Sequence, residues 1–450
     1  MNMKKTMMII PLSTTILFGG TVNTALADHH KEPKPTVMTE AAELRTNLDH
    51  LLSEHAYLAV EAMRKGADGS ADFEQAAEAL NENAVDLSNA IGSVYGKEAG
   101  NQFEDMWKNH IGFFVDYVKA TGAGNEEKKQ KALDNLSDYR QEFSKFLESA
   151  TEERLEADAL AEGLQMHVNQ LIGAFDEYVA GNYEKAYEYE REAINHMYGV
   201  SKGLSSAIVQ QFPDKFNNTK AVTPATDLRS NLNHLLSEHA GLAAMAMQNG
   251  IDGSEDFEAS AQALANNTDD LSNAIASVYG EEAGSKFKEM WSGHIEDFVS
   301  YVKATGAEDE EKQQAALDAL ADYRADFSKF LETATEERLK ADNLEKGLEM
   351  HVNQLIGTFD SYVAEDYDQA YDELRGAYKH MLNPAKGLSD AFVNQFPDEF
   401  MMEMPSDMPK TGMGGTAEEG MSLEYILLGG FALTLAISTI AINRTRRESK

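Results

Sequence analysis

The chain of 450 residues contains no cysteine. It can therefore form no disulfide, thiol nucleophile, thiolate metal site or covalently attached haem, and its folding must rest on burial of apolar surface. Positive charge is also scarce, because 39 basic residues face 76 acidic ones and the formal net charge is −37. Such a surface repels nucleic acid and anionic lipid, and it concentrates cations near itself. We therefore expect no nucleic-acid partner.

Proline is the next scarce residue, with nine in the chain and none from Thr36 to Phe212. Glycines instead fall in clusters, such as residues 66–69 and 122–124, between long runs rich in Ala, Glu, Leu and Lys. Both features favour helices joined by short turns. The pattern predicts helices near 41–65, 70–94, 98–120, 126–148, 152–179 and 183–210, the last of them breaking around Gly199.

The chain repeats itself at an offset of 184 residues. Without a gap, Leu44–Phe216 and Leu228–Phe400 are identical at 112 of 173 positions. Each copy is long enough for a single domain. We predict an all-α fold of two tandem antiparallel helical-bundle modules, with about six helices each. Module 1 spans residues 41–216, a linker spans 217–227, and module 2 spans 228–400, where Pro384 at the position of Val200 supports a helix break.

The N-terminus has the pattern of a secretory signal peptide. Lys4 and Lys5 precede an apolar run over residues 7–20, and Ala25-Leu26-Ala27 supplies a small-x-small cleavage site. Residues 1–27 are therefore predicted to be a signal peptide that is removed after Ala27. Residues 28–40 would follow as a flexible leader.

The C-terminus carries three ordered elements. Residues 401–424 form a methionine-rich linker that includes Met408-Pro409-Lys410-Thr411-Gly412, residues 425–442 are apolar enough for a transmembrane helix, and residues 443–450 are a basic tail. The length of the apolar segment and the basic tail predict a span with a cytoplasmic C-terminus.

These elements resemble the sorting signal of Gram-positive cell-wall-anchored surface proteins, which has the form Leu-Pro-x-Thr-Gly, apolar span, basic tail. Met408 replaces the leucine of that pattern, whereas Pro409, Thr411 and Gly412 match it. The resemblance implies that a sortase cuts between Thr411 and Gly412 and joins the protein to peptidoglycan. We expect an exported protein that is anchored to the cell wall or membrane, with its N-terminal region outside the cell.

Four histidines of each module fall on the apolar faces of predicted helices. His55, for example, lies on a stripe with Leu48, Leu51 and Leu58, and His110 continues the line of Phe103. Four inward imidazoles in one core can share a metal ion as the partner of their ring nitrogens. The predicted ligands are His55, His110, His167 and His196 in module 1, and His239, His294, His351 and His380 in module 2.

Methionines refine this metal prediction. Met106 lies one helical turn before His110, and Met290 one turn before His294. Imidazole combined with thioether favours copper, with zinc or a haem held by two histidines as alternatives. The histidines could also serve only for packing. A carboxylate-bridged di-iron centre is disfavoured, because the inward faces lack the Glu-x-x-His pairs that such bundles use.

One further histidine joins the candidate set, and another is excluded from it. After signal cleavage His30 would be the third residue, where it can complete a square-planar Cu(II) or Ni(II) site with the free amine. His50 lies beside Glu54 on the polar side of its helix, so we predict that it is a surface residue or lies just outside the site.

The modules are similar to secreted helical proteins that are sometimes labelled copper amine oxidases. An oxidase of that type makes its quinone from the tyrosine of an Asn-Tyr-(Asp/Glu) motif. Asn182-Tyr183-Glu184 matches that motif, but residues 366–368 of module 2 read Asp-Tyr-Asp, and those enzymes are β-rich. The sequence thus favours a surface protein that sequesters or delivers a metal over an enzyme. A structural spacer or adhesin and a haem carrier remain the alternatives.

Overall fold

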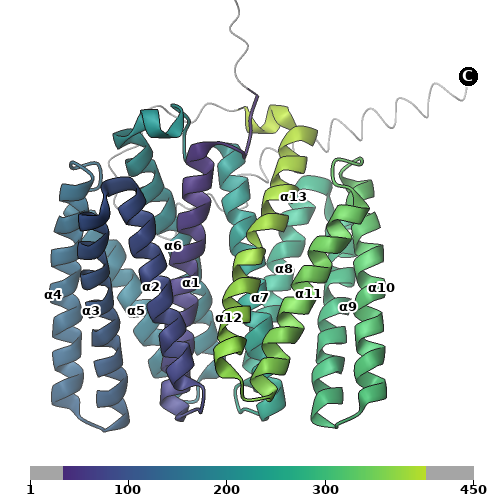
Figure 1. Cartoon of the computed structure of the whole chain (residues 1–450), viewed down its shortest axis with the longest axis horizontal. Helices are drawn as coiled ribbons and strands as arrows, with labels where there is room; N and C mark the ends of the chain where they lie inside the picture. The colour runs from purple at the N-terminus through teal and green to yellow at the C-terminus, as the bar shows by residue number, and fades with distance from the viewer. Residues whose placement is uncertain (1–33, 402–450) are drawn as a thin grey trace, which may run out of the picture. The chain divides into compact units, whose positions relative to one another are not determined.

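The fold is given by a computed structural model that describes residues 34–401 (Figure 1). All regular structure in this range is helical, which confirms the predicted fold class. The predicted signal peptide, residues 28–33 of the predicted leader, and the predicted sorting motif, transmembrane helix and basic tail fall outside the described residues. No helix within residues 34–401 combines the length and the apolar character that a bilayer span requires.

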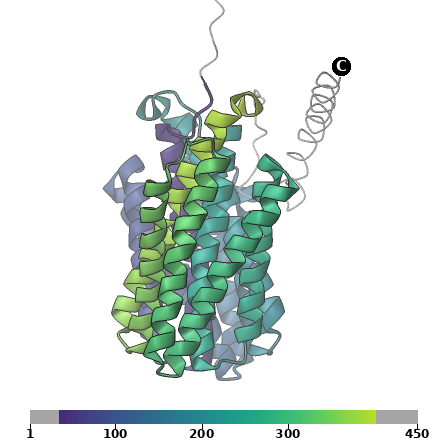
Figure 2. The same cartoon turned by 90° about the vertical axis from the view of Figure 1, so that its right-hand side faces the viewer.

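Each repeat forms an antiparallel bundle. Module 1 consists of α1 (Glu40–Asp68), α2 (Phe73–Tyr95), α3 (Lys97–Gly122), α4 (Glu126–Ala150), α5 (Ala157–Val179), α6 (Tyr183–Gln211) and the short 3₁₀ helix η1 (Pro213–Phe216). Module 2 consists of α7 (Pro224–Asp252), α8 (Phe257–Tyr279), α9 (Glu281–Gly306), α10 (Glu310–Ala334), α11 (Ala341–Val363), α12 (Tyr367–His380), α13 (Leu382–Gln395) and η2 (Pro397–Phe400). Figure 2 shows the helices of module 2 running up and down beside one another.

Local sequence signals explain the ends of α1. The side chain of Thr39 accepts a hydrogen bond from the amide of Ala42, which satisfies one free donor of the first turn. Gly69 ends the helix with φ of 63°, a left-handed conformation that glycine adopts without steric cost.

The start of α5 differs from the prediction. This helix begins at Ala157 and not at residue 152, because Glu152 and Glu153 have φ of 50° and 61° and form a turn.

The predicted helix break near Gly199 is found in only one module. In module 2 the last helix is split between His380 and Leu382, so that α12 and α13 are separate. Pro384 explains this, because its ring clashes with the carbonyl of residue 380 and it has no amide hydrogen. In module 1 Val200 replaces the proline, and α6 runs unbroken through Gly199. The prediction of a break in module 1 was therefore wrong.

Helices α1 and α7 lie at the centre of the described fold, where the two modules meet (Figure 1). Of the 29 residues of α1, those from Leu48 to Lys65 are buried without interruption. One face of each central helix packs into its own module, and the opposite face packs against the other central helix. The polar side of α1 therefore contacts protein and not solvent.

Reciprocal ion pairs hold the module interface. Arg375 of α12 reaches Glu54 of α1 at 3.2 Å and Asp86 of α2 at 2.7 Å. At the equivalent positions, Arg191 of α6 reaches Glu238 of α7 at 3.0 Å and Asp270 of α8 at 2.7 Å. The same contact thus occurs twice, once in each direction, as in a symmetric dimer of two modules.

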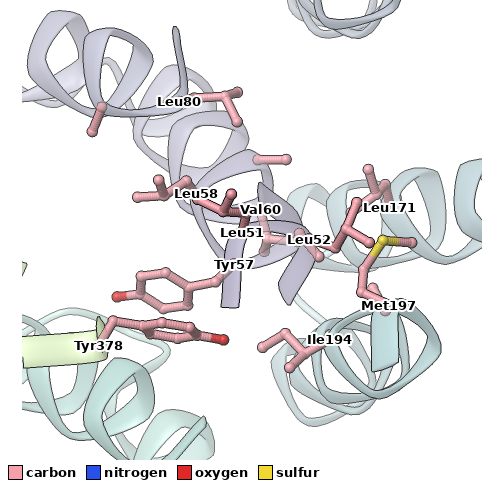
Figure 3. Packing of buried hydrophobic residues seen from close by; sticks show 14 of the residues in the cluster. Leu51, Leu52, Tyr57, Leu58, Val60, Leu80, Leu171, Ile194, Met197 and Tyr378 are labelled. Carbon is pink, nitrogen blue, oxygen red and sulfur yellow. The ribbon is translucent and has the colours of Figure 1, made fainter. Parts of the chain in front are cut away.

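The centre of the interface is not symmetric. The hydroxyl of Tyr57 donates a hydrogen bond to the carbonyl of Gly241, its own counterpart in module 2, at 3.2 Å. A Cβ atom at position 241 would lie only 2.9 Å from the Tyr57 ring. Tyr57 also stacks on Tyr378 with ring centroids 5.5 Å apart, as Figure 3 shows. A large side chain in one module thus fills the space that a missing side chain leaves in the other.

The charged residues of the interface are also distributed unequally between the two modules. Arg64 of α1 is buried and bonds both Asp256 at the start of α8 and Glu61 of its own helix, while Lys65 bonds Asp72 at 2.8 Å. The positions equivalent to Glu61, Arg64 and Lys65 in module 2 are Met245, Gln248 and Asn249, which are neutral. Module 1 therefore supplies both cations of this buried network.

Candidate metal centre

The three consecutive hairpins of a module each place one histidine at a common point. His55 comes from α1, His110 from α3 and His167 from α5, and one ring nitrogen of each lies within 4.8 Å of the others. Module 2 repeats the arrangement with the triad of His239, His294 and His351. The predicted inward faces of these helices thus meet in the core of each bundle.

The spacing of the ring nitrogens fits a shared ion. The Nε2 atoms of His55 and His110 lie 3.4 Å apart. Two nitrogens that bind one metal at 2.0–2.1 Å, with angles between tetrahedral and trigonal, would be separated by about 3.3–3.6 Å. For a direct hydrogen bond between the two rings, 3.4 Å is long.

Most ring nitrogens of the triads have no other partner. Within the described residues no hydrogen-bond partner exists for Nδ1 of His55, Nδ1 of His110 or either nitrogen of His167. Module 2 shows the same for both nitrogens of His239, both of His351 and Nδ1 of His294. A buried polar atom without a partner costs about 1–3 kcal/mol. An ion shared by the three rings would give a partner to the nitrogens that face the common point, such as one nitrogen of His167 and one of His351.

Burial keeps the imidazoles neutral. His55, His110 and His167 are between 1 and 4 % exposed. Burial lowers the pKa of His110 to about 3. The Trp107 backbone raises this pKa slightly, but it forms no normal hydrogen bond with either ring nitrogen. Burial and the neighbouring imidazoles also lower the pKa of His55 and of His167 well below the usual value. All three rings are thus in the form that binds metal ions.

Aromatic rings enclose each triad. The ring of Trp107 lies 4.7 Å from those of both His55 and His110, and Tyr139 stacks on His110 at 4.9 Å. In module 2, Trp291 and Tyr323 make the same contacts with His239 and His294. The sequence patterns did not identify these aromatic residues as part of the site. The spacing of Trp107 and Trp291, each three residues before a triad histidine, was the available signal.

The fourth predicted ligand of each module lies outside the triad. His380 pairs its Nε2 with the carbonyl of Gly347 at 3.0 Å, and because a carbonyl only accepts, this nitrogen carries the proton. His196, at the equivalent position, lines a cavity of about 30 Å³ together with His167 and apolar side chains. The structure thus brings together three of the four predicted histidines in each module.

The remaining candidates have different places. His50 was expected at the surface or just outside the site, and it is buried at the module interface near Tyr378, with ring centroids 6.2 Å apart. The expectation of exposure was wrong, because the second module covers that face of α1. Met106 and Met290 are half-buried and pack against the cores. His30 lies outside the described residues.

Chemically, each triad offers three neutral, converging nitrogen ligands in a site that is nearly closed to solvent. Such a site can hold an ion and shield it from water, and the described residues place no acidic ligand beside it. Comparison of the chain with protein-family models, curated proteins and solved structures finds no match, so function has to be argued from this site.

Proposed function

We propose that the protein binds one late transition-metal ion, most simply copper, in the histidine triad of each module. The observation that carries this proposal is the 3.4 Å approach of two imidazole nitrogens, with a third histidine converging on them and no other partners for most of the ring nitrogens. Imidazole suits copper, zinc and other late metals, and the absence of cysteine removes thiolate competition.

The depth of the site favours storage over rapid exchange. All six triad histidines are buried, and the module interface covers the helices that carry His55 and His239. An ion in such a site leaves slowly, because helices must separate before water reaches it. We therefore favour sequestration, with delivery to a partner as a slower second step.

A haem carrier is less well supported. Pockets that hold organic ligands of moderate size have volumes of about 300–1,000 Å³. The cavity beside His167 measures about 30 Å³, which is room for a water-sized molecule. The spacer or adhesin alternative predicts that no metal binds at all, and the following experiment separates it from the proposal.

Copper is expected to raise the melting temperature of the purified protein by several degrees, because an ion at 100 times its dissociation constant stabilises the folded state by about 2.7 kcal/mol per site. His110→Gln should reduce the stoichiometry from two ions to one. The double variant His110→Gln with His294→Gln should bind none. Calorimetry and metal analysis of the desalted protein measure both effects.

The matched control replaces histidines that lie outside the triads. His196→Gln with His380→Gln should keep two bound ions and the full rise in melting temperature. A wild-type protein whose melting temperature is changed by none of Cu(I), Cu(II) and Zn(II) would rule out the metal function and favour the spacer. Loss of binding in the control pair would instead return His196 and His380 to the ligand set.

Display at the cell surface is a separate part of the proposal, and it rests on the signal-peptide and sorting-signal patterns. In Gram-positive cells, Thr411→Ala is expected to move the protein from the peptidoglycan fraction to the membrane fraction, because a sortase could no longer cut after residue 411. Thr416→Ala, four residues after the motif, should leave the distribution unchanged. An unaltered distribution in Thr411→Ala would disprove wall attachment by this motif.

A further inference from the structure

We propose that the triads select a monovalent ion, Cu(I) or its chemical analogue Ag(I), over Zn(II) and other divalent ions. This inference rests on the proposed metal function and concerns the charge that the site accepts. Three observations support it: the charge of the ligands, the direction of the nearest carboxylates, and the nature of the walls.

The triad ligands carry no negative charge. Each site consists of three imidazoles, and among the described residues no Asp, Glu or Cys joins them. The cost of moving an ion from water into a site of low polarity grows with the square of its charge, so a divalent ion would cost about four times as much as a monovalent one. Without an anionic ligand, the triad compensates a single charge far more easily than two.

The nearest carboxylates along the chain point elsewhere. Glu54 directly precedes His55, but its carboxylate accepts hydrogen bonds from Asn83 at 2.7 Å and Arg375 at 3.2 Å in the module interface. Glu238, which precedes His239, is held in the same way by Asn267 and Arg191. These acidic groups are already neutralised by cations, so they lend little negative charge to the metal sites.

The residues that surround each triad also suit an ion with a single charge. Metal-binding histidines usually donate their second nitrogen to a carboxylate or carbonyl, which raises their basicity. Here the outer nitrogen Nδ1 of His55 and of His110 has no such acceptor, and the ring of Trp107 lies 4.7 Å from both imidazoles. An aromatic ring at this place brings no negative charge to the site. Three neutral ligands also match the low coordination number that Cu(I) and Ag(I) accept.

The test is a competition on the whole purified protein without oxygen. Cu(I) is presented from a chromophoric Cu(I) chelator, Ag(I) is used as a redox-inert probe, and Zn(II) is presented from a zinc indicator. We expect two Cu(I) or two Ag(I) per chain, and Zn(II) bound at least about a hundredfold more weakly. The variant His110→Gln with His294→Gln should lose both monovalent ions.

A second variant tests the charge argument directly. His167→Asp with His351→Asp supplies each site with one carboxylate, and it should weaken Ag(I) binding and strengthen Zn(II) binding. If this variant fails to fold, the wild-type competition still decides. Zn(II) binding as tightly as Cu(I) would overturn the monovalent assignment and leave the metal function intact, whereas no binding of any of the three ions would overturn the metal function itself.

Discussion

The metal-free protein is expected to lose most of its stability between pH 6.5 and pH 5. Burial lowers the pKa of His110, His294 and His351 to about 3, and the neighbouring histidines add to the effect for His351. In the unfolded chain a histidine has a pKa of about 6.5. Below pH 6.5 the unfolded state therefore takes up protons that the folded state refuses until about pH 3, and the fold loses stability across that window.

The expected loss is large. At pH 5 each of these three histidines costs about 2 kcal/mol, or about 6 kcal/mol together, which is comparable to the whole stability of many domains. The pKa values of His55, His167 and His239 are lowered as well, so they act in the same direction. Glu190 acts in the opposite direction, because burial raises its pKa to about 8, but it accounts for only one proton.

Urea unfolding at pH 7.5, 6.5, 5.5 and 5.0 measures this effect. The variant His110→Gln with His294→Gln should have a shallower dependence of unfolding free energy on pH. Below pH 6.5 its slope should be smaller than that of the wild type by about 3 kcal/mol per pH unit, because its unfolded state takes up two protons fewer. Bound metal should move the transition to lower pH, because an ion that binds only the folded state adds to its stability at every pH where it stays bound. Equal stability of the wild type at pH 7.5 and pH 5.0 would mean that the triads are open to protons.

Replacing Arg64 with methionine is expected to cost about 3–5 kcal/mol, because it leaves buried acidic partners without their cation. Arg64 is 4 % exposed; it bonds Asp256 across the module interface, and within its own module it bonds Glu61 and the hydroxyl of Tyr187. Urea unfolding at pH 7.5 gives the free energy. Both triads should stay intact, because these contacts lie on the interface side of α1.

Two further variants separate the effect of the Arg64 charge from the effect of its packing. Arg154→Met removes a half-buried arginine that pairs with the exposed Glu152 at 3.0 Å, and should cost less than about 1 kcal/mol. The double variant Arg64→Met with Asp256→Asn removes both charges and should regain a large part of the lost stability. A double variant as unstable as Arg64→Met alone would show that packing of the arginine stem, and not its charge, holds the interface.

The apolar pattern of α1 predicted one face of that helix and could not predict the other. Leu48, His55 and Leu58 face the core of module 1 as expected. The opposite face carries Glu54 and Arg64, and charged side chains are almost always solvated. They are buried here because complementary charges arrive from a second module that lies 184 residues away in sequence, and helical periodicity contains no information about such a partner.

The candidate site shows the same limit. Helical phase alone placed His55, His110 and His167 inward, and the structure brings them together. It also placed His196 inward, but phase does not say which neighbour a side chain meets. His196 lies beside the apolar cavity, and in module 2 the Nε2 of His380 pairs with the carbonyl of Gly347. Convergence of ligands depends on how helices cross, which a single sequence does not reveal.

The contact between Tyr57 and Gly241 has a consequence for how such chains can change in length. Two copies of module 1 would set tyrosine against tyrosine, and two copies of module 2 would leave an empty space between two glycines. The repeats are still alike enough to recombine, yet a chain that lost or gained a single repeat would expose one buried, highly charged helix face to water. Viable relatives of this protein should therefore carry these modules in complementary pairs, so that the pair, and not the module, is the unit that evolution can copy.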